Sequence, residues 1–352
     1  MQTVLLPAAV PVTFGIVSPA DWGRRYLDAL SGSSKMRFAG VWGRSSENAS
    51  AVVAKYGGIT YATFDELINA PEIEAILLPT PHFLHYAQTK AALLAGKHVF
   101  VEKPLANRLD EAVELKTLSE QRGRVLGVGL QGRRTAGIRK AKAMIESGEV
   151  GKIGIVVVMH GSPHVHLTYK PGDWETSEAT MPGGILDQLG VHYAEVLHYL
   201  FGPVARVSGF VNRHISAYPT IDCAAGSYEF ASGVVAVHAV HQISAYISEL
   251  RIFTDRGILQ INRMGREVIW EAFGDLATAK AGAAGRENIP IAGPEMNTTA
   301  IREELEEFAE CIRAGRRPEV GAAEGIAALR LTRAVIEAHK TGRAVDPALL
   351  TD

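Results

Sequence analysis

Short apolar runs alternate with helical patterns from residue 12 to about residue 128. Five runs rich in Val, Ile, Leu or Phe predict strands at residues 12–17, 37–42, 73–78, 98–101 and 125–128. Segments with helical character separate them, for example residues 24–30 and 86–95. Strands that alternate with helices of this length indicate βαβ units, and therefore a parallel sheet with helices on both faces.

The pattern changes after residue 128. A helical pattern over residues 138–147 precedes an apolar run at 153–159. Further strand-like runs with short turns between them lie at residues 204–211, 226–230, 234–241, 250–254, 258–261 and 268–270. Consecutive strands without helices between them favour an antiparallel sheet, and the chain then returns to helix. We therefore expect an α/β protein: a Rossmann-like domain with a parallel sheet over residues 1–128, and an α/β domain with an open, mainly antiparallel sheet over residues 129–352.

Composition narrows the classes of function. The 352 residues carry 36 Lys and Arg against 38 Asp and Glu, a net charge of -2, so we expect neither a nucleic-acid nor a membrane partner. Cys223 and Cys311 are too few and too far apart for a disulfide framework. The apolar start has no preceding basic residue, and no apolar run reaches about 18 residues. These features predict a cytoplasmic protein that acts on small molecules.

The first strand runs into a candidate phosphate-binding turn, SPADWGR, at residues 18–24. A dinucleotide fingerprint would place glycine at 18, 20 and 23, and here only Gly23 remains. Ser18 and Ala20 are small enough to let a phosphate approach the helix N-terminus, whereas Pro19 removes one amide. The candidate cofactor residues in this turn are Ser18, Pro19, Ala20, Trp22 and Gly23. An ordinary strand-turn-helix is the alternative.

The second strand ends without the acidic residue that usually selects NAD. Instead, Arg44 can pair with a 2'-phosphate and Ser45 can donate a hydrogen bond to it, which favours NADP while leaving NAD possible. A solvated arginine at a strand end is the alternative interpretation.

Three further segments carry a family resemblance. They read LPTPHFLH at residues 78–85, AGKHVFVEKP at 95–104 and PGGILDQLGVH at 182–192. With the preceding pattern they resemble the glucose-fructose oxidoreductase and inositol dehydrogenase family, Gfo/Idh/MocA, over nearly the whole chain. The GKHVxxEKP block is the most specific part of the resemblance.

The resemblance implies an NAD(P)-dependent oxidoreductase that transfers a hydride to or from a sugar, cyclitol or related polyol. It implies that Lys103 contacts cofactor and substrate and assists proton movement, that Glu102 bounds the nicotinamide ribose, and that His192 is the acid/base. It also implies a cofactor cleft lined by Pro79, Thr80, His82 and His85, and a homodimer or homotetramer.

The chemistry of lysine and histidine fits the roles that the resemblance implies for Lys103 and His192. Lys103 follows a strand at the edge where open α/β sheets bind ligands, and an ammonium there stabilises a developing alkoxide. Imidazole titrates near neutrality, so His192 can accept or donate the hydroxyl proton. The alternatives are a surface lysine and a buried, hydrogen-bonded core histidine.

The chain departs from the family pattern beside His192. The aspartate usually found four residues earlier is replaced by Gln188, and Asp187 lies one residue further away. One residue turns a helical side chain by about 100°. Either the turn absorbs this offset and Asp187 still faces the site, as a catalytic and substrate-binding residue, or Gln188 supplies only hydrogen bonds.

The segment before this motif is a candidate substrate wall. In family terms His164 can bond a substrate hydroxyl and Trp174 can stack on a sugar face. The spacing of His164 and His166 near Asp173 is also compatible with a zinc site, but no matching Cys or HExxH pattern accompanies it, and we expect no metal. The degraded phosphate turn and the Asp187 offset leave a second hypothesis, a catalytically inactive binding or regulatory module.

Overall fold

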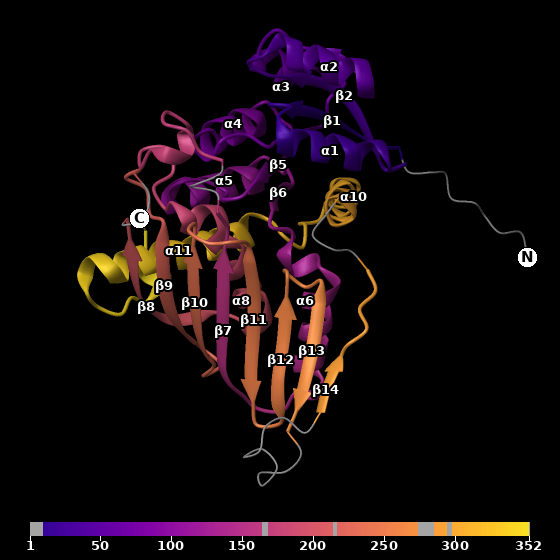
Figure 1. Ribbon diagram of the computed structural model, residues 1–352. Coiled ribbons are helices and arrows are strands. Elements are labelled where there is room, and N and C mark those ends of the chain that lie inside the picture. Colours follow the sequence, from indigo (N-terminus) through magenta and orange to yellow (C-terminus); the bar gives the residue numbers. More distant parts are fainter. Residues whose placement is uncertain (1–9, 164–167, 214–216, 274–284, 294–297, 352) are drawn as a thin grey trace, which may run out of the picture.

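A six-stranded parallel sheet forms the N-terminal half of the molecule (Figure 1). The computed structural model describes residues 10–163, 168–213, 217–273, 285–293 and 298–351. The strand order is β3-β2-β1-β4-β5-β6. The strands are β1 (Val12–Val17), β2 (Met36–Trp42), β3 (Ile59–Thr60), β4 (Ala75–Leu78), β5 (His98–Glu102) and β6 (Leu126–Gly129). This arrangement confirms the predicted Rossmann-like sheet.

Helices flank this sheet because its strands are apolar on both faces, as in β1, where all six residues are buried. They are α1 (Asp21–Ser31), α2 (Ser46–Tyr56), α3 (Phe64–Asn69), α4 (His82–Leu94) and α5 (Leu109–Gln121). Helix α10 (Thr298–Ala314), from the far end of the chain, joins them. The ring of its Phe308 lies 5.4 Å from that of Phe100 and 6.2 Å from that of Phe14. The N-terminal core therefore includes a helix that the division at residue 128 assigns to the other domain.

The second sheet has eight strands in the order β14-β13-β12-β11-β7-β10-β9-β8. Its strands are β7 (Ile153–Gly161), β8 (Val204–Asn212), β9 (Cys223–Phe230), β10 (Val235–His241), β11 (Ile247–Thr254), β12 (Gly257–Asn262), β13 (Glu267–Ala272) and β14 (Gly285–Asn288). Only the β7–β10 pair among these is parallel. The mainly antiparallel sheet is thus confirmed.

One face of the second sheet packs against helices α6 (Ala136–Glu146), α8 (Val191–Phe201) and α11 (Ala322–Thr341), and Figure 1 shows the opposite face without helices. The strands alternate accordingly: Leu250 and Ile252 are fully buried, whereas Arg251 between them is exposed. Helix α11 also contacts α5 and β6 of the first domain, so one helix packs on both halves. Among the described residues, no helix is both long and apolar enough to cross a membrane.

The strand order sets the position of the site. From β1 the chain moves outward through β2 to β3, then crosses back to β4 on the other side of β1, so the strand order reverses between β1 and β4. In open α/β sheets, ligands bind beyond the carboxyl ends of the strands at such a point. The predicted strand at residues 73–78 begins only at Ala75. Strands β3 and β14 were not predicted, because both are short and fully exposed and carry no apolar pattern.

Candidate active site

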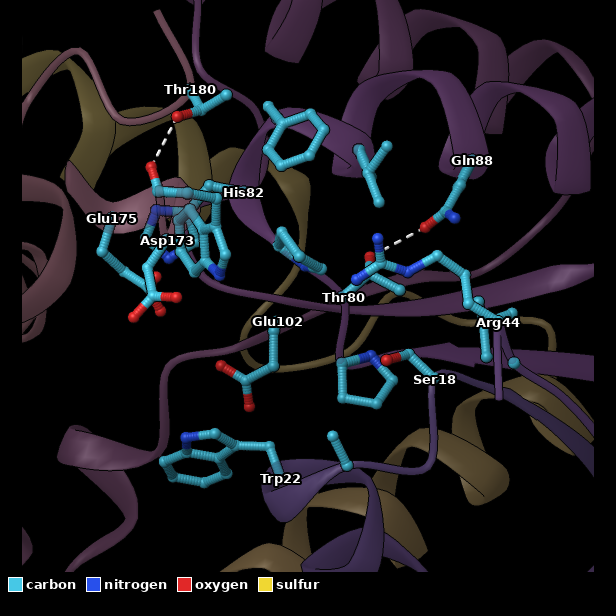
Figure 2. Close-up of a pocket in the computed structure, with 18 of the residues that line it drawn as sticks. Ser18, Trp22, Arg44, Thr80, His82, Gln88, Glu102, Asp173, Glu175 and Thr180 are labelled. Atoms are coloured by element: carbon cyan, nitrogen blue, oxygen red, sulfur yellow. Dashed lines mark hydrogen bonds between the residues drawn. The ribbon is translucent and has the colours of Figure 1, made fainter. Parts of the chain in front are cut away.

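A pocket of about 1000 Å³ lies where the topology places it, between the carboxyl ends of the parallel strands and a loop of the second domain (Figure 2). Residues after β1, β2, β4 and β5 form one wall, and the segment at residues 172–180 forms another. The predicted residues that line it are Ser18, Ala20, Trp22, Arg44, Pro79, Thr80, His82, Glu102, Lys103, Trp174 and Gln188. The predicted residues outside its lining are Pro19, Gly23, Ser45, His85, Asp187 and His192.

The turn after β1 is shaped for a close backbone approach. Ser18 has a φ of 61°, a left-handed conformation that glycine would adopt most easily. A Cβ at Gly23 would lie 2.7 Å from the Ser18 carbonyl oxygen, so glycine is required for helix α1 to pack against the turn. Ala20 is the N-cap of α1 and makes no side-chain cap. The first amides of α1 therefore remain available for an anion from outside the helix.

Arg44 and Ser45, which follow β2, have different surroundings. Arg44 lines the pocket and lies at its edge in Figure 2. Ser45 is the N-cap of α2, where its Oγ accepts a hydrogen bond of 3.2 Å from the amide of Asn48. Of the two candidates for contact with a ribose phosphate, the structure brings Arg44 to the pocket and gives Ser45 a capping bond.

The TPHFLH segment supplies both lining and support. Thr80 donates from Oγ1 to Gln88 Oε1 at 2.8 Å, and both residues line the pocket. His85 is buried behind the wall, with its ring nitrogens 2.7 Å from the Pro104 carbonyl and 2.8 Å from the Thr80 carbonyl. Burial lowers the pKa of His85 to about 4. His85 thus ties the end of β4 to the turn after β5.

Strand β5 ends at Glu102, and both Glu102 and the following residue, Lys103, line the pocket. The Tyr26 hydroxyl donates to Glu102 Oε1, and Glu102 Oε2 accepts from the Lys103 amide at 3.2 Å. Lys103 Nζ donates to the Gln188 carbonyl at 2.8 Å, and the Lys103–Pro104 peptide bond is cis. Burial lowers the pKa of Lys103, while the charges of Glu102 and Asp187 oppose that shift. The ammonium therefore joins the cofactor-side strand to the second domain.

Asp187 and Gln188 lie in a π-helical turn, Leu186–Gly190, directly before α8. A π turn contains one more residue than an α turn, so it absorbs the one-residue offset of the motif. Asp187 is fully buried and accepts two bonds from Arg333 of α11, at 2.7 and 3.0 Å, and one of 2.9 Å from the Gly183 amide. Asp187 therefore does not face the pocket, contrary to the first alternative, whereas Gln188 lines it.

His82 lines the pocket, whereas His192, in α8, is buried outside its lining. Burial lowers the pKa of His192 well below its usual value, and the charge of Lys103 lowers it further. The pKa of His82 is lowered by the same two causes, with His192 a smaller contributor. The positive charge of Lys103 thus acts on both imidazoles. Among the described residues, Nδ1 of each histidine is buried without a hydrogen-bond partner.

Trp174 lines the pocket and lies in the 3-10 turn Trp174–Thr176. Its ring lies 4.6 Å from the His82 ring, edge on, and 6.4 Å from the Phe83 ring. It therefore bridges the second-domain loop to helix α4. His164 and His166 lie outside the described residues. Within those residues, no three His, Cys, Asp or Glu side chains are grouped to hold a metal ion.

Several pocket residues were not predicted. One is Gly43, where a Cβ would lie 2.8 Å from Pro19 Cδ, so that only glycine fits without a shift. Its position at the end of a strand is a signal that could have identified it. Gln88, Phe83 and Glu175 are others. Arg333 lies 146 positions from its partner Asp187, a separation that local patterns do not connect.

Comparisons with known proteins agree with this geometry. Residues 12–130 match a family model described as "Oxidoreductase family, NAD-binding Rossmann fold", and residues 138–260 match the "GFO/IDH/MocA C-terminal domain". The chain is 25% identical to a 1,5-anhydro-D-fructose reductase of Ensifer adhaerens, over 95% of this chain and 98% of that one. It is 27% identical to a scyllo-inositol 2-dehydrogenase (NADP(+)) of Bacillus subtilis, over 80% and 81%.

Solved structures share the fold. A putative NADPH-dependent oxidoreductase from Desulfitobacterium hafniense superposes with a TM-score of 0.87 at 24% identity, covering 97% of this chain and 99% of that one. A levoglucosan dehydrogenase in complex with NADH and levoglucosan gives 0.85 at 20% identity, covering 96% and 99%.

Proposed function

The chain belongs to the Gfo/Idh/MocA family of oxidoreductases, and on that premise we propose that it transfers a hydride between NADP and a hydroxyl or keto group of a sugar, cyclitol or related polyol. The observation that carries the proposal is the pocket itself, which brings Lys103 to the carboxyl edge of a parallel sheet, beside the turn after β1 that is open to a phosphate. Membership of this family makes the chain an enzyme, so the inactive-module hypothesis is set aside.

The pocket fits a dinucleotide. The turn from Ser18 to Ala20 exposes the amides of α1, and Gly23 and Gly43 let the backbone pack too closely for a side chain. These amides are suited to hold a pyrophosphate. Glu102 lies further along the pocket, where it can accept a hydrogen bond from a ribose hydroxyl. A bound nicotinamide supplies the hydride acceptor or donor.

The chain's own residues manage the proton. In the oxidation direction the substrate hydroxyl loses its proton to a ring nitrogen of His192, which is neutral at pH 7 because its pKa is lowered. Lys103 Nζ carries three protons, of which one is donated to Gln188, so another can reach the developing alkoxide. The paired Arg333 and Asp187 hold the segment that carries Gln188. In reduction the proton moves back from His192.

The preference for NADP over NAD is supported by Arg44. It is the cationic residue at the end of β2, the position from which a side chain reaches the adenosine ribose in this type of sheet. A guanidinium there can bond a 2'-phosphate with two nitrogens. We also propose a cytoplasmic location, which is supported by Cys223 and Cys311, neither of which forms a disulfide.

Cofactor titration and turnover together test the proposal. NADPH and NADH are titrated in parallel against the purified chain by fluorescence, and turnover is measured with 1,5-anhydro-D-fructose, scyllo-inositol and levoglucosan. We expect NADPH to bind more tightly and at least one polyol or keto sugar to react. Failure of both nucleotides to bind would refute the proposal.

The pH profile follows from the two shifted groups. The active form needs neutral His192 and charged Lys103. Activity in the oxidation direction should therefore show two limbs. Because both pKa values are lowered, the midpoint of the acid limb should lie below the usual histidine pKa of 6.5, and the midpoint of the alkaline limb should lie below the usual lysine pKa of 10.5. Lys103→Met should lower kcat by about 100-fold or more and remove the alkaline limb. The surface variant Lys116→Met should keep the wild-type profile; an alkaline limb that persists in Lys103→Met would exclude this role.

Substitution of Arg44 tests cofactor choice. Arg44→Ala should weaken NADPH binding about tenfold to 100-fold, because a charge-assisted bond to the phosphate is lost, and should leave NADH binding unchanged. Arg44→Lys should restore part of the NADPH affinity, and the exposed Arg122→Ala serves as the control. Equal losses for the two nucleotides would contradict a contact with the 2'-phosphate.

We propose further that the helix-free face of the second sheet associates with another copy of the chain. Strands β7 and β10 pair in parallel register there, which brings Ile155 opposite Val235 and Val157 opposite Val237. Ile155 is 41% exposed and Val235 is 40% exposed, although both are apolar. An exposed apolar patch on a sheet face is typical of an association surface.

Molar mass in solution tests this association. Light scattering should give two or four times the chain mass of 37.9 kDa. Ile155→Lys should shift the protein to smaller species, since the face would then bury an unpaired charge. A monomeric wild type, or an Ile155→Lys variant with an unchanged mass, would rule out this face.

A further inference from the structure

The charges that line the pocket are separated by sign. Among the described lining residues, the cations are Arg44 and Lys103 and the anions are Glu102, Asp173 and Glu175. Figure 2 shows Arg44 at one side of the pocket and the three carboxylates toward the other. The pocket therefore has one basic end and one acidic end, with Lys103 on its floor.

The two ends serve different ligands under the proposed function. Arg44 and the turn at Ser18 follow β2 and β1, where the adenosine and the phosphates of a dinucleotide would lie. The acidic end includes the loop from Gly172 to Thr180, which belongs to the second domain and faces helix α4. A substrate that reaches Lys103 from this side lies against that loop.

The acidic loop is held in place by its own hydrogen bonds. Asp173 Oδ2 accepts a bond of 2.8 Å from the Lys170 amide, and its carbonyl accepts one of 2.7 Å from the Thr176 hydroxyl. Trp174, between the two acidic residues, packs on His82 and Phe83. Both carboxylates are half-buried, so solvent screens them less than it would on an open surface.

We propose, building on the function above, that the substrate is a sugar or polyol without phosphate or carboxylate groups, and that Asp173 and Glu175 determine this specificity. Ionised carboxylates only accept hydrogen bonds, so they pair well with the hydroxyl donors of a polyol. A phosphate or carboxylate substituent would instead lie beside two like charges. Among the described lining residues of this end, no arginine offers a bidentate partner.

Matched pairs of substrates test the proposal. Each pair joins a neutral compound to its acidic derivative: glucose with glucose 6-phosphate, glucose with glucuronate, and myo-inositol with its monophosphate. We expect kcat/KM for the neutral member to exceed that of the acidic member by about 100-fold or more. Where an acidic member is not turned over, its inhibition constant against the neutral substrate gives the comparison.

Two variants, each of which removes one negative charge, test whether these carboxylates cause the discrimination against acidic substrates. Glu175→Gln and Asp173→Asn keep the size of each side chain, and Asn retains an oxygen that can accept from the Lys170 amide. Each variant should raise kcat/KM, or the affinity as inhibitor, of the acidic member relative to the neutral one by about tenfold. Glu178→Gln is the matched control, because Glu178 is exposed on the same loop, pairs with Arg213 and does not line the pocket. It should leave the ratio unchanged.

The possible failures are distinct. Turnover confined to phosphorylated or acidic sugars, or a ratio that Glu175→Gln and Asp173→Asn leave unchanged, overturns the inference while the proposed hydride transfer stands. Binding of NADPH without turnover of any sugar or polyol overturns both the proposed substrate class and this inference.

Discussion

The hydrogen bond from Lys103 Nζ to the Gln188 carbonyl is the interaction on which the site depends. It joins the end of β5 to a turn 85 residues later, and so closes the pocket between two separately built cores. Burial disfavours the ammonium, and the carboxylates of Glu102 and Asp187 counter that effect. Asp187 is in turn fixed by Arg333 from a helix that packs on both domains. The ammonium is thus tied to the turn at residues 187–188, and that turn is tied to α11.

Apolar patterning was enough to predict both sheets, because the buried strands of a parallel sheet and the alternating strands of an antiparallel one carry strong periodic signals. It did not predict β3 and β14, whose residues are exposed. It also could not place α10. The apolar stripe of that helix shows that Phe308 is buried, but only the fold shows that it is buried against Phe14 and Phe100.

The site was predictable where a residue follows a strand. Arg44, Glu102 and Lys103 all lie at carboxyl ends, and all line the pocket. Residues behind the pocket wall were harder to place: His85 lies in the same segment as Thr80 and His82, yet its ring nitrogens face two backbone carbonyls outside the lining. The sequence left the offset at Asp187 open, and a π turn accommodates it. No motif distinguishes Glu175 in the sequence; only the fold shows that it lines the pocket beside Asp173.

Under the proposed function, the sheet edge binds the nucleotide, a loop of the second domain contacts the substrate, and Lys103 lies where the two meet. A crystal structure of the chain with NADP and a neutral polyol tests this most directly. We expect the nicotinamide beside Glu102 and Lys103, with one substrate oxygen within about 3.2 Å of both Lys103 Nζ and a ring nitrogen of His192. A nicotinamide bound elsewhere, or a substrate oxygen that meets neither side chain, would contradict the account.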